Sequence, residues 1–441
     1  MTTYWCEHAQ LPGGVATGVR LTVEGDRLVE VETRTKAQPG DERLGGIVLP
    51  GFANAHSHVF HRALRGRTHG GGGNFWTWRE HMYAVTARLD PDSYLDLARA
   101  VFAEMVCAGY TVVGEFHYVH HQPSGHPYAD PNVMARSLIQ AAAEAGIRLT
   151  LLDTLYLAGG LTGDGHVPLG EEQRRFGDGS VEGWAKRVAE LSGGPALRIG
   201  AAAHSVRAVP REDLAAFAAV VDDRPVHVHV SEQLAENVAA QAFYGLTPTE
   251  LLAETGLLRP TVTTVHSTHL VDTDLETMAR SGATACLCPT TERDLADGIG
   301  PARALHDRGV PLAVGSDQHV VIDPFVEVRA VEEHERLVTN ERGRFALRDL
   351  ADMGGTNGYR ALGWERGGAL EPGALADLLA VRLDSVRTAG ARPDQVVFAA
   401  GAPDVTDVVI GGERVVTDGR HRLGPVDTLL GEALRRLREP A

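Results

Sequence analysis

Two histidines separated by a single residue offer the clearest chemistry in this sequence. His56 and His58 follow an apolar run that begins at Gly45 and predicts a β-strand. Side chains alternate between the faces of a strand, so these two imidazoles point to the same side. Two neutral imidazoles on one side of a strand end supply half of a tetrahedral zinc site. A pair of this kind is often incidental, but three further strand-like segments also end in His, His and Asp.

The remaining candidate ligands stand at the ends of later strand-like segments. His227 and His229 share one parity, but His229 lies nearer the strand end and is the better third ligand. We interpret His227 as a residue deeper in the fold that hydrogen-bonds behind the site. Asp317 follows the apolar run from Pro311 and is predicted to be the fourth ligand and a proton acceptor. Bound zinc lowers the pKa of a coordinated water toward about 7, which supplies a nucleophile at neutral pH.

Two residues near these strand ends are candidates for proton transfer. Glu232 follows His229 by three residues and is predicted to lie in a loop over the site, where a carboxylate can relay protons. His266 ends the apolar part of the next strand-like segment and is preferred over His269, which lies three residues further on. His319 is close to Asp317 in sequence and is given no role.

Two other strand-like segments end in polar residues that the proposed ligand set does not use. Tyr118 follows one of them, and His204 and Arg207 follow the other. These side chains are therefore predicted to bind a substrate, although a surface position is an equally good interpretation of Arg207. The planar guanidinium forms paired hydrogen bonds with carboxylates, so an arginine here favours an anionic substrate.

These residues need a scaffold that brings distant strand ends together. Strand-like and helix-like segments alternate along the middle of the chain, and several strands are the continuous apolar runs typical of strands covered on both faces. This alternation predicts an α/β protein with a (β/α)8 barrel of the TIM type, whose sites lie at the C-terminal ends of the strands. The predicted strands are 47–55, 111–119, 148–157, 196–204, 225–231, 261–267, 284–288 and 311–316.

The two ends of the chain have a different pattern. Residues 1–46 and 366–441 contain short alternating segments separated by turn residues, which indicates antiparallel strands. We expect both ends to form one small β-sandwich domain, with the metal-dependent hydrolase barrel inserted as residues 47–365. Within the barrel, prolines at 91 and 131 predict helix starts, because proline suits the first helical turn. The long connection 59–90, with its glycine tract and tryptophans, predicts a pocket wall or lid.

Composition limits the possible partners. The chain has 441 residues, of which 43% are hydrophobic and 23% charged, as in a globular enzyme. Its net charge of −16 argues against nucleic acid and against anionic membranes as partners. No apolar run approaches the roughly 18 residues of a membrane span, and no secretory signal is visible, so a cytoplasmic protein is expected. The cysteines have no zinc-knuckle or disulfide spacing.

The chain resembles the amidohydrolase superfamily, and within it the mononuclear-zinc deaminases. The resemblance rests on Pro50-Gly-Phe-Ala-Asn-Ala-His-Ser-His58, His229-x-x-Glu232, His266 and Ser316-Asp317. Further motifs are similar to those of the members that act on N-formimidoyl-L-glutamate: Asn74-Phe-Trp-Thr-Trp-Arg-Glu-His-Met-Tyr83, Gly114-Glu-Phe-His-Tyr118 and His204-Ser-Val-Arg-Ala208. The resemblance implies zinc-dependent hydrolysis of this dianionic small molecule to N-formyl-L-glutamate and ammonia, in histidine degradation, by a homodimer with one zinc ion per subunit.

The same resemblance implies a role for each matching residue. The implied metal ligands are His56, His58, His229 and Asp317, and the implied catalytic groups are Glu232, His266 and Asp317. The implied substrate-binding residues are His61, Arg79, Tyr118, His204 and Arg207. Position 61 departs from the family pattern, which has glutamine there, but histidine can also donate a hydrogen bond.

The chemistry of the substrate agrees with these residues. Formimidoylglutamate carries two carboxylates, which suit the guanidinium groups of Arg79 and Arg207. An aromatic base would need a stacking slot instead. Two alternatives stay open: a related deaminase of a purine, a pterin or a nucleoside, and a barrel-shaped assembly protein that has lost catalysis. Ammonia-release assays separate the first alternative, and metal analysis separates the second.

Overall fold

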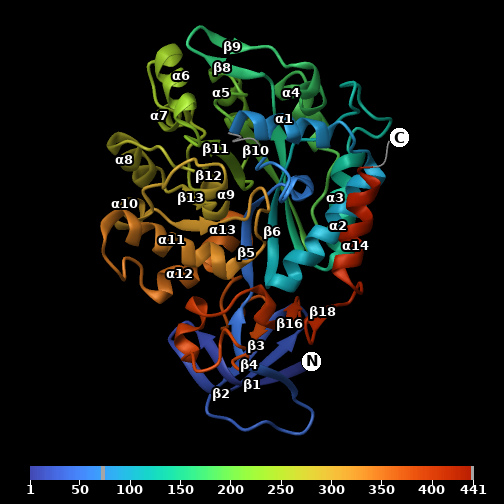
Figure 1. Ribbon diagram of the computed structural model, residues 1–441, viewed down its shortest axis with the longest axis vertical. Helices are drawn as coiled ribbons and strands as arrows, with labels where there is room; N and C mark the ends of the chain where they lie inside the picture. The colour runs from blue at the N-terminus through green and yellow to red at the C-terminus, as the bar shows by residue number, and fades with distance from the viewer. Residues whose placement is uncertain (71–74, 439–441) are drawn as a thin grey trace.

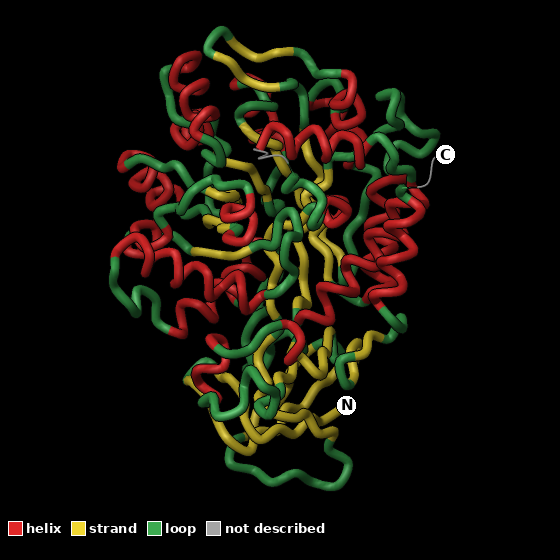
Figure 2. The backbone as a smooth tube through the Cα atoms, in the orientation of Figure 1, coloured by secondary structure: helices red, strands yellow, loops and turns green. Residues whose placement is uncertain are grey.

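The computed structural model describes residues 1–70 and 75–438. In the view of Figure 1 a barrel lies above a smaller sheet that contains the N-terminus. Figure 2 shows the barrel strands in the interior with helices around them. Among the described residues, no helix has both the length and the apolar character needed to cross a bilayer.

The barrel sheet has eight parallel strands within the described part of the chain, in the order β14-β13-β12-β11-β10-β7-β6-β5. Backbone hydrogen bonds close it, because His58 donates to Asp317 and Asp317 donates to His56 at N–O distances of 3.1 and 3.0 Å. The predicted barrel is therefore confirmed. Its strands are β5 (Phe52–Ser57), β6 (Tyr110–His117), β7 (Arg148–Leu155), β10 (Leu197–Ser205), β11 (Val226–Val230), β12 (Val262–His266), β13 (Thr284–Leu287) and β14 (Leu312–Val314).

Helices follow most of the strands and cover the outside of the barrel (Figure 1). Those between β6 and β13 are α3 (Val133–Ala145), α4 (Val181–Val188), α5 (Arg211–Val220), α6 (Leu234–Tyr244), α7 (Pro248–Glu254) and α8 (Asp272–Ser281). Those after β13 are α9 (Pro289–Asp294), α10 (Ala302–Asp307), α11 (Pro324–Thr339), α12 (Leu347–Gly354) and α13 (Thr356–Ala361). Short 3-10 helices are η1 (Val59–Leu64), η2 (Glu171–Phe176), η3 (Pro393–Phe398) and η4 (Ala402–Asp404).

Proline marks one of the two predicted helix starts correctly. Helix α2 (Pro91–Ala108) begins at Pro91, and the Asp90 side chain accepts a hydrogen bond from the Ser93 amide at 2.7 Å. The second prediction was two residues early, since α3 begins at Val133. There the Asp130 carboxylate accepts from the Asn132 amide at 2.9 Å and stabilises a turn before the helix.

The smaller sheet is built from both chain ends, as predicted. Its order is β18-β17-β16-β15-β4-β1-β2-β3, so β15 from the C-terminal part pairs with β4. The sheet also curls back, because the Leu28 amide in β3 donates to the Ala374 carbonyl ahead of β15 at 2.9 Å. The strands are β1 (Thr2–Leu11), β2 (Gly14–Glu24), β3 (Arg27–Glu32), β4 (Glu42–Pro50), β15 (Leu378–Val381), β16 (Val405–Ile410), β17 (Glu413–Thr417) and β18 (Arg420–His421).

Two segments pack with a different part of the molecule from the one to which the predicted domain boundaries assign them. Residues 47–50, expected in the first barrel strand, instead pair with β1 and β15 in the smaller sheet. The predicted strand 47–55 is thus two strands that meet at Gly51, where a Cβ would clash with the Thr111 side chain. Helix α14 (Val426–Arg436) lies along α2 of the barrel, and its Arg436 contacts Asp96 at 2.6 Å. The full division into 1–46 with 366–441 and 47–365 stays a prediction.

A buried ion pair joins the smaller sheet to the lower end of the barrel. Asp377, just before β15, receives two hydrogen bonds from Arg148 at the start of β7, at 2.8 and 3.1 Å. Tyr359 and the Gly411 amide also donate to this carboxylate, at 2.9 and 2.7 Å. Because all of its oxygens are hydrogen-bonded, this buried charge fixes the relative position of the two sheets.

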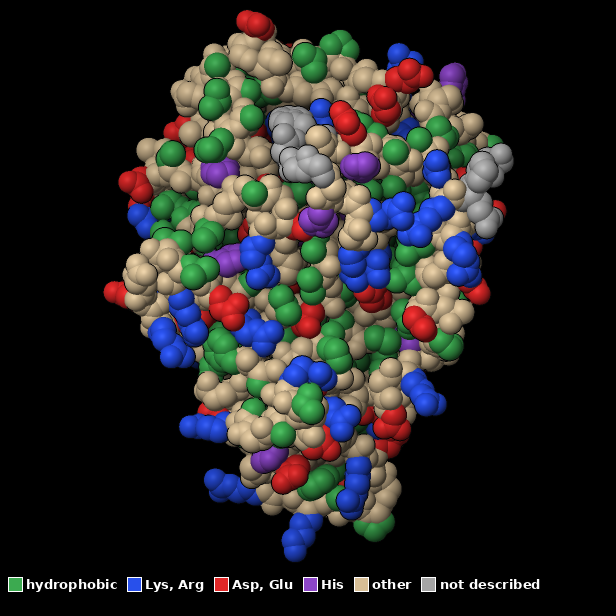
Figure 3. Space-filling model, in the orientation of Figure 1, with side chains coloured by type: hydrophobic (Ala, Val, Ile, Leu, Met, Phe, Trp, Pro, Cys, Tyr) green, Lys and Arg blue, Asp and Glu red, His purple; other side chains and the backbone are tan. Residues whose placement is uncertain are grey.

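The opposite end of the barrel carries the long connections. Helix α1 (Phe75–Thr86) and the hairpin β8 (Gly160–Thr162) and β9 (Gly165–Val167) lie at the top of Figure 1, away from the smaller sheet. Part of the predicted wall, the glycines at 71–73 and Asn74, lies outside the described residues. Figure 3 shows basic and acidic side chains interspersed over one face, so the net charge of −16 forms no continuous acidic surface there.

Candidate metal centre

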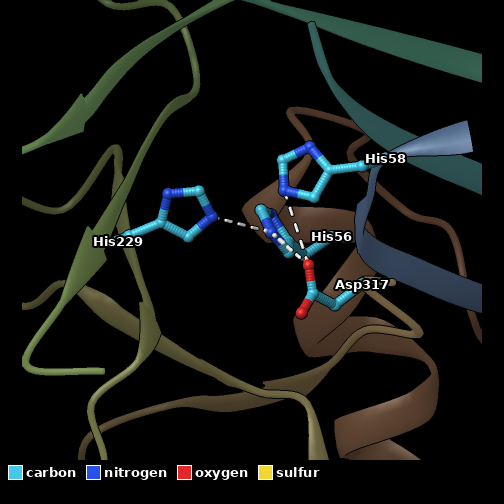
Figure 4. Close-up of side chains that lie close together, drawn as sticks. All are labelled: His56, His58, His229 and Asp317. Carbon is cyan, nitrogen blue, oxygen red and sulfur yellow. Dashed lines mark hydrogen bonds and ion pairs between the residues drawn. The ribbon is translucent and has the colours of Figure 1, made fainter. Parts of the chain in front are cut away.

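The four predicted ligand residues converge at the C-terminal end of the barrel. His56 lies in β5, His58 follows that strand, His229 lies in β11, and Asp317 follows β14. Their side chains point toward one another (Figure 4), and all four are buried. His56 Nε2 and His58 Nε2 lie 3.3 and 3.4 Å from Asp317 Oδ1. His229 Nε2 lies 3.1 Å from His56 Nε2.

These separations suit a tetrahedral cation. Zinc binds imidazole nitrogen and carboxylate oxygen at about 2.0–2.1 Å, which places tetrahedral ligand atoms roughly 3.3 Å apart. His56 Nε2 lies 3.1 Å from His229 Nε2 and 3.3 Å from Asp317 Oδ1, which is close to this spacing. The donor set and its spacing therefore fit a divalent metal ion.

Hydrogen bonds set the imidazole tautomers. His58 Nδ1 donates to the Phe116 carbonyl at 2.9 Å, and His229 Nδ1 donates to the His204 carbonyl at 2.8 Å. Each Nε2 consequently keeps its lone pair for the shared point. Burial lowers the pKa of His56 to about 3, so this imidazole is also neutral. Burial opposes ionisation of Asp317, but the hydrogen bond from His56 and the neighbouring histidines hold its pKa well below the usual range.

The predicted proton-transfer residues lie next to this cluster. Glu232, at the end of β11, accepts a hydrogen bond from Arg207 Nη2 at 3.0 Å. Its other oxygen lies 3.9 Å from His266 Nε2, and the His266 ring stacks on the His229 ring with centroids 5.6 Å apart. Burial disfavours the charged form of His266, yet the nearby carboxylates of Glu232, Glu292 and Asp317 raise its pKa to about 10.

A cavity of about 320 Å³ opens onto the cluster. Its wall includes the predicted substrate-binding residues His61, Arg79, Tyr118, His204 and Arg207. His61 Nε2 lies within hydrogen-bond distance of the Tyr118 hydroxyl, at 3.1 Å, so the residue that departs from the family pattern still belongs to a polar pair in this wall. The structure thus brings the predicted substrate-binding residues into the wall of one cavity beside the cluster.

Other wall residues were not found by sequence reasoning. They are Tyr156, Phe176, Gln233, Glu236 and Leu295, together with residues of the β8–β9 hairpin, whereas Trp78, Met82 and Tyr83 lie in the connection 59–90 that was predicted as a pocket wall or lid. Tyr156 follows β7 and packs on His204 with ring centroids 4.4 Å apart. Its position just after a strand is a signal that could have identified it. Glu236 carries a weaker signal, since it lies one helical turn after Glu232.

The histidines without an assigned role lie outside this cavity wall. His227 bonds through Nε2 to the Ala361 carbonyl at 3.1 Å, deeper in the barrel, in agreement with its interpretation. His319 lies between Ser57 and Ser316, with ring nitrogens 3.1 and 2.9 Å from their hydroxyls. It therefore links the ends of the first and last barrel strands.

A second group of possible ligands, His117, His120 and Asp153, lies near the end of β6. Arg187 already occupies both oxygens of Asp153, at 2.8 and 2.9 Å, and Trp184 donates to one of them at 3.1 Å. A guanidinium at this position satisfies the carboxylate and repels a cation, so the group is a buried ion network.

Comparison with known proteins agrees with this geometry. The model of the amidohydrolase family matches residues 47–415, which is most of the chain. The protein belongs to the amidohydrolase family, whose enzymes catalyse hydrolysis with a divalent metal ion. This membership identifies the chain as a hydrolytic enzyme that acts on a small molecule.

Several relatives cover nearly the whole chain. A formimidoylglutamate deiminase from Pseudomonas aeruginosa is 40% identical over 96% of both chains. A 5-methylthioadenosine/S-adenosylhomocysteine deaminase from Natronomonas pharaonis is 28% identical over 98% of this chain and 97% of its own. The crystal structure of an amidohydrolase from Brucella melitensis covers 100% of both chains, with 34% identity and a TM-score of 0.92. An adenosine deaminase from Xanthomonas campestris with bound zinc shares the fold, at a TM-score of 0.82, 23% identity and coverage of 99% and 97%.

Proposed function

We propose that this enzyme hydrolyses N-formimidoyl-L-glutamate to N-formyl-L-glutamate and ammonia. The 40% identity to a formimidoylglutamate deiminase supports this substrate. The observation that carries the proposal is a cavity that combines two arginines, Arg79 and Arg207, with the four-residue metal cluster. A substrate with two carboxylates and a hydrolysable amidine carbon matches that combination.

The proposed cofactor is one zinc ion per subunit, held by His56, His58, His229 and Asp317. Three imidazoles and one carboxylate form a donor set that zinc accepts readily. When bound there, zinc lowers the pKa of water and polarises the group under attack. The neutral tautomers set by Phe116 and His204 support this assignment.

The chain's own groups account for the proton transfers. Asp317 accepts the proton of the attacking water. His266 is cationic at neutral pH, because the neighbouring carboxylates raise its pKa to about 10. It therefore stabilises the negative charge that develops in the tetrahedral intermediate. Glu232 relays to the departing nitrogen the two protons that the attacking water loses, one of them by way of Asp317, so that this nitrogen leaves as ammonia.

The cavity wall provides the recognition of the substrate. Arg79 and Arg207 bind its two carboxylates, since a guanidinium presents paired donors. His61, Tyr118 and His204 supply further hydrogen bonds around the amidine and the chain. These groups favour a flexible dianion over a planar purine.

Ammonia release from formimidoylglutamate tests the proposal directly. Purified enzyme with measured zinc content is assayed beside adenosine-type, guanine and pterin substrates, because adenosine-related deaminases are also relatives. The proposal requires kcat/KM for formimidoylglutamate to exceed that for every ring substrate. A preference for a ring substrate would replace it with the alternative deaminase function.

On the same resemblance we propose a homodimer in the cytoplasm. Native mass measurement and the zinc-to-protein ratio check the subunit number and the single ion per subunit. A monomeric native mass, or two zinc ions per chain, would contradict these two statements.

A further inference from the structure

Glu236 is a buried carboxylate in the cavity wall to which the proposed mechanism gives no task. It lies near the start of α6, and its side chain has no solvent exposure. Burial raises the pKa of Glu236 to about 7, against the opposing charge of Arg207. Arg207 and the backbone amides of Ser231 and Glu232 stabilise its charged form. Burying a carboxylate is costly unless it is paired with a nearby cation.

The cation beside it is Arg207. Arg207 Nε lies 3.6 Å from Glu236 Oε2, while Arg207 Nη2 donates to Glu232 at 3.0 Å. The guanidinium therefore has one acid beside its Nε and another beside its Nη2. Glu236 lies at Nε, and Glu232 accepts the hydrogen bond from Nη2.

Helix α6 also holds the backbone of Arg207. Tyr244, at the end of α6, bonds through its hydroxyl to His166 Nε2 at 2.7 Å. His166 Nδ1 in turn donates to the Arg207 carbonyl at 3.2 Å. One end of α6 thus lies beside the guanidinium of Arg207 through Glu236, and the other end reaches the backbone of Arg207 through His166.

We propose that Glu236 is a positioning residue for Arg207. It holds the Nε edge, so that the terminal amino groups stay directed into the cavity to receive a substrate carboxylate. This inference rests on the proposed function, in which Arg207 binds one carboxylate of formimidoylglutamate. Glu236 does not contact the reacting atoms in this scheme, so its loss weakens substrate binding more than turnover.

A double-mutant cycle tests the positioning role, since it measures whether two residues act through each other. The variants are Glu236→Gln, Arg207→Met and the double variant, each with zinc content and thermal unfolding measured. Glu236→Gln is expected to raise KM for formimidoylglutamate by about tenfold, a modest loss for one partner of a buried charge pair. Its kcat is expected to stay within about threefold of the wild type, whereas a distorted active site would also lower kcat strongly.

The decisive comparison is between the two backgrounds. When Arg207 is already methionine, adding Glu236→Gln is expected to change KM by less than about twofold, because the residue to be positioned is gone. Glu254→Gln is the matched control: Glu254 also lies 3.6 Å from an arginine, Arg211, but on α7 outside the cavity wall. This control is expected to leave KM unchanged.

A second variant guards against misfolding. Glu236→Asp keeps the charge but moves it one methylene away from Arg207. Its KM is compared in the same two backgrounds, and it is expected to rise only when Arg207 is present. Equal losses in both backgrounds, or an unchanged KM with Arg207 present, would overturn the positioning role while the proposed function stands. A wild-type enzyme that releases no ammonia from formimidoylglutamate would overturn both.

Discussion

Replacing Glu232 with glutamine is the sharpest test of the proton-transfer scheme. The amide has the same shape as the carboxylate and can still accept the hydrogen bond that Arg207 donates at 3.0 Å. It cannot deliver a proton to the departing nitrogen. A positioned general acid or base contributes about 10²–10⁴-fold to the rate, which corresponds to roughly 3–5 kcal/mol of the barrier. We therefore expect kcat to fall by two to four orders of magnitude.

The other properties of this variant should change little. Glu232 is not among the four clustered ligands, so Glu232→Gln is expected to retain the metal content of the wild type. The assay is continuous ammonia release under saturating formimidoylglutamate, together with metal analysis and thermal unfolding. Glu254→Gln again serves as a control that removes a carboxylate outside the cavity. A kcat within tenfold of the wild type, with metal retained, would refute the role of Glu232 in proton transfer.

Three further predictions concern the metal, the pH dependence of stability and the joint between the sheets. Asp317→Asn is expected to lower metal affinity by at least about a hundredfold, because losing a ligand costs at least as much as losing a residue that hydrogen-bonds to a ligand. Metal retained after dialysis would contradict this. Burial raises the pKa of Glu327 to about 8, so the stability that this carboxyl contributes is present below its unfolded pKa and is lost as pH rises through 8. Glu327→Gln is therefore expected to unfold like the wild type at pH 5 but to be more stable at pH 9, by up to about 5 kcal/mol, and equal unfolding temperatures at pH 9 would exclude it. Asp377→Asn breaks the buried pair with Arg148 and is expected to cost about 3–5 kcal/mol, or roughly 3–5 °C in Tm, whereas an unchanged Tm would show that the joint does not depend on this charge.

Sequence alone located the barrel strands because several of them are nearly continuous apolar runs that alternate with helix-like segments. In β11, for example, every residue from Val226 to Val230 is buried, so the run of apolar residues and histidines is visible without any tertiary information. The positions of the ligands follow from the same strands. Alternate residues of a strand point to the same face, which shows which histidines can share a metal ion. His227 and His229 share a face, and His229 was preferred because it lies nearer the strand end.

Other features depend on contacts that no local pattern encodes. The apolar run through Pro50 continues into β5 without a polar break, so only the tertiary pairing shows that its first residues belong to the smaller sheet. Helix α3 begins two residues later than predicted because of the turn that the Asp130 side chain stabilises before it. Glu236 lies on a helix among exposed neighbours such as Leu234 and Val238, and its burial against Arg207 follows from the packing of α6 on the barrel.

The precision of the metal cluster follows from how the barrel closes. His56 lies in the first strand of the sheet and Asp317 follows the last strand, and these two strands are hundreds of residues apart in sequence but adjacent in space. The backbone amide of Asp317 donates to the His56 carbonyl at 3.0 Å, so the seam of the barrel is hydrogen-bonded at the ligand residues themselves. Gly315 allows this approach, because a Cβ there would lie 2.8 Å from the His56 Cβ. Any change that opens the seam must therefore separate two ligands, which ties metal affinity to barrel closure more tightly than to the helices outside it.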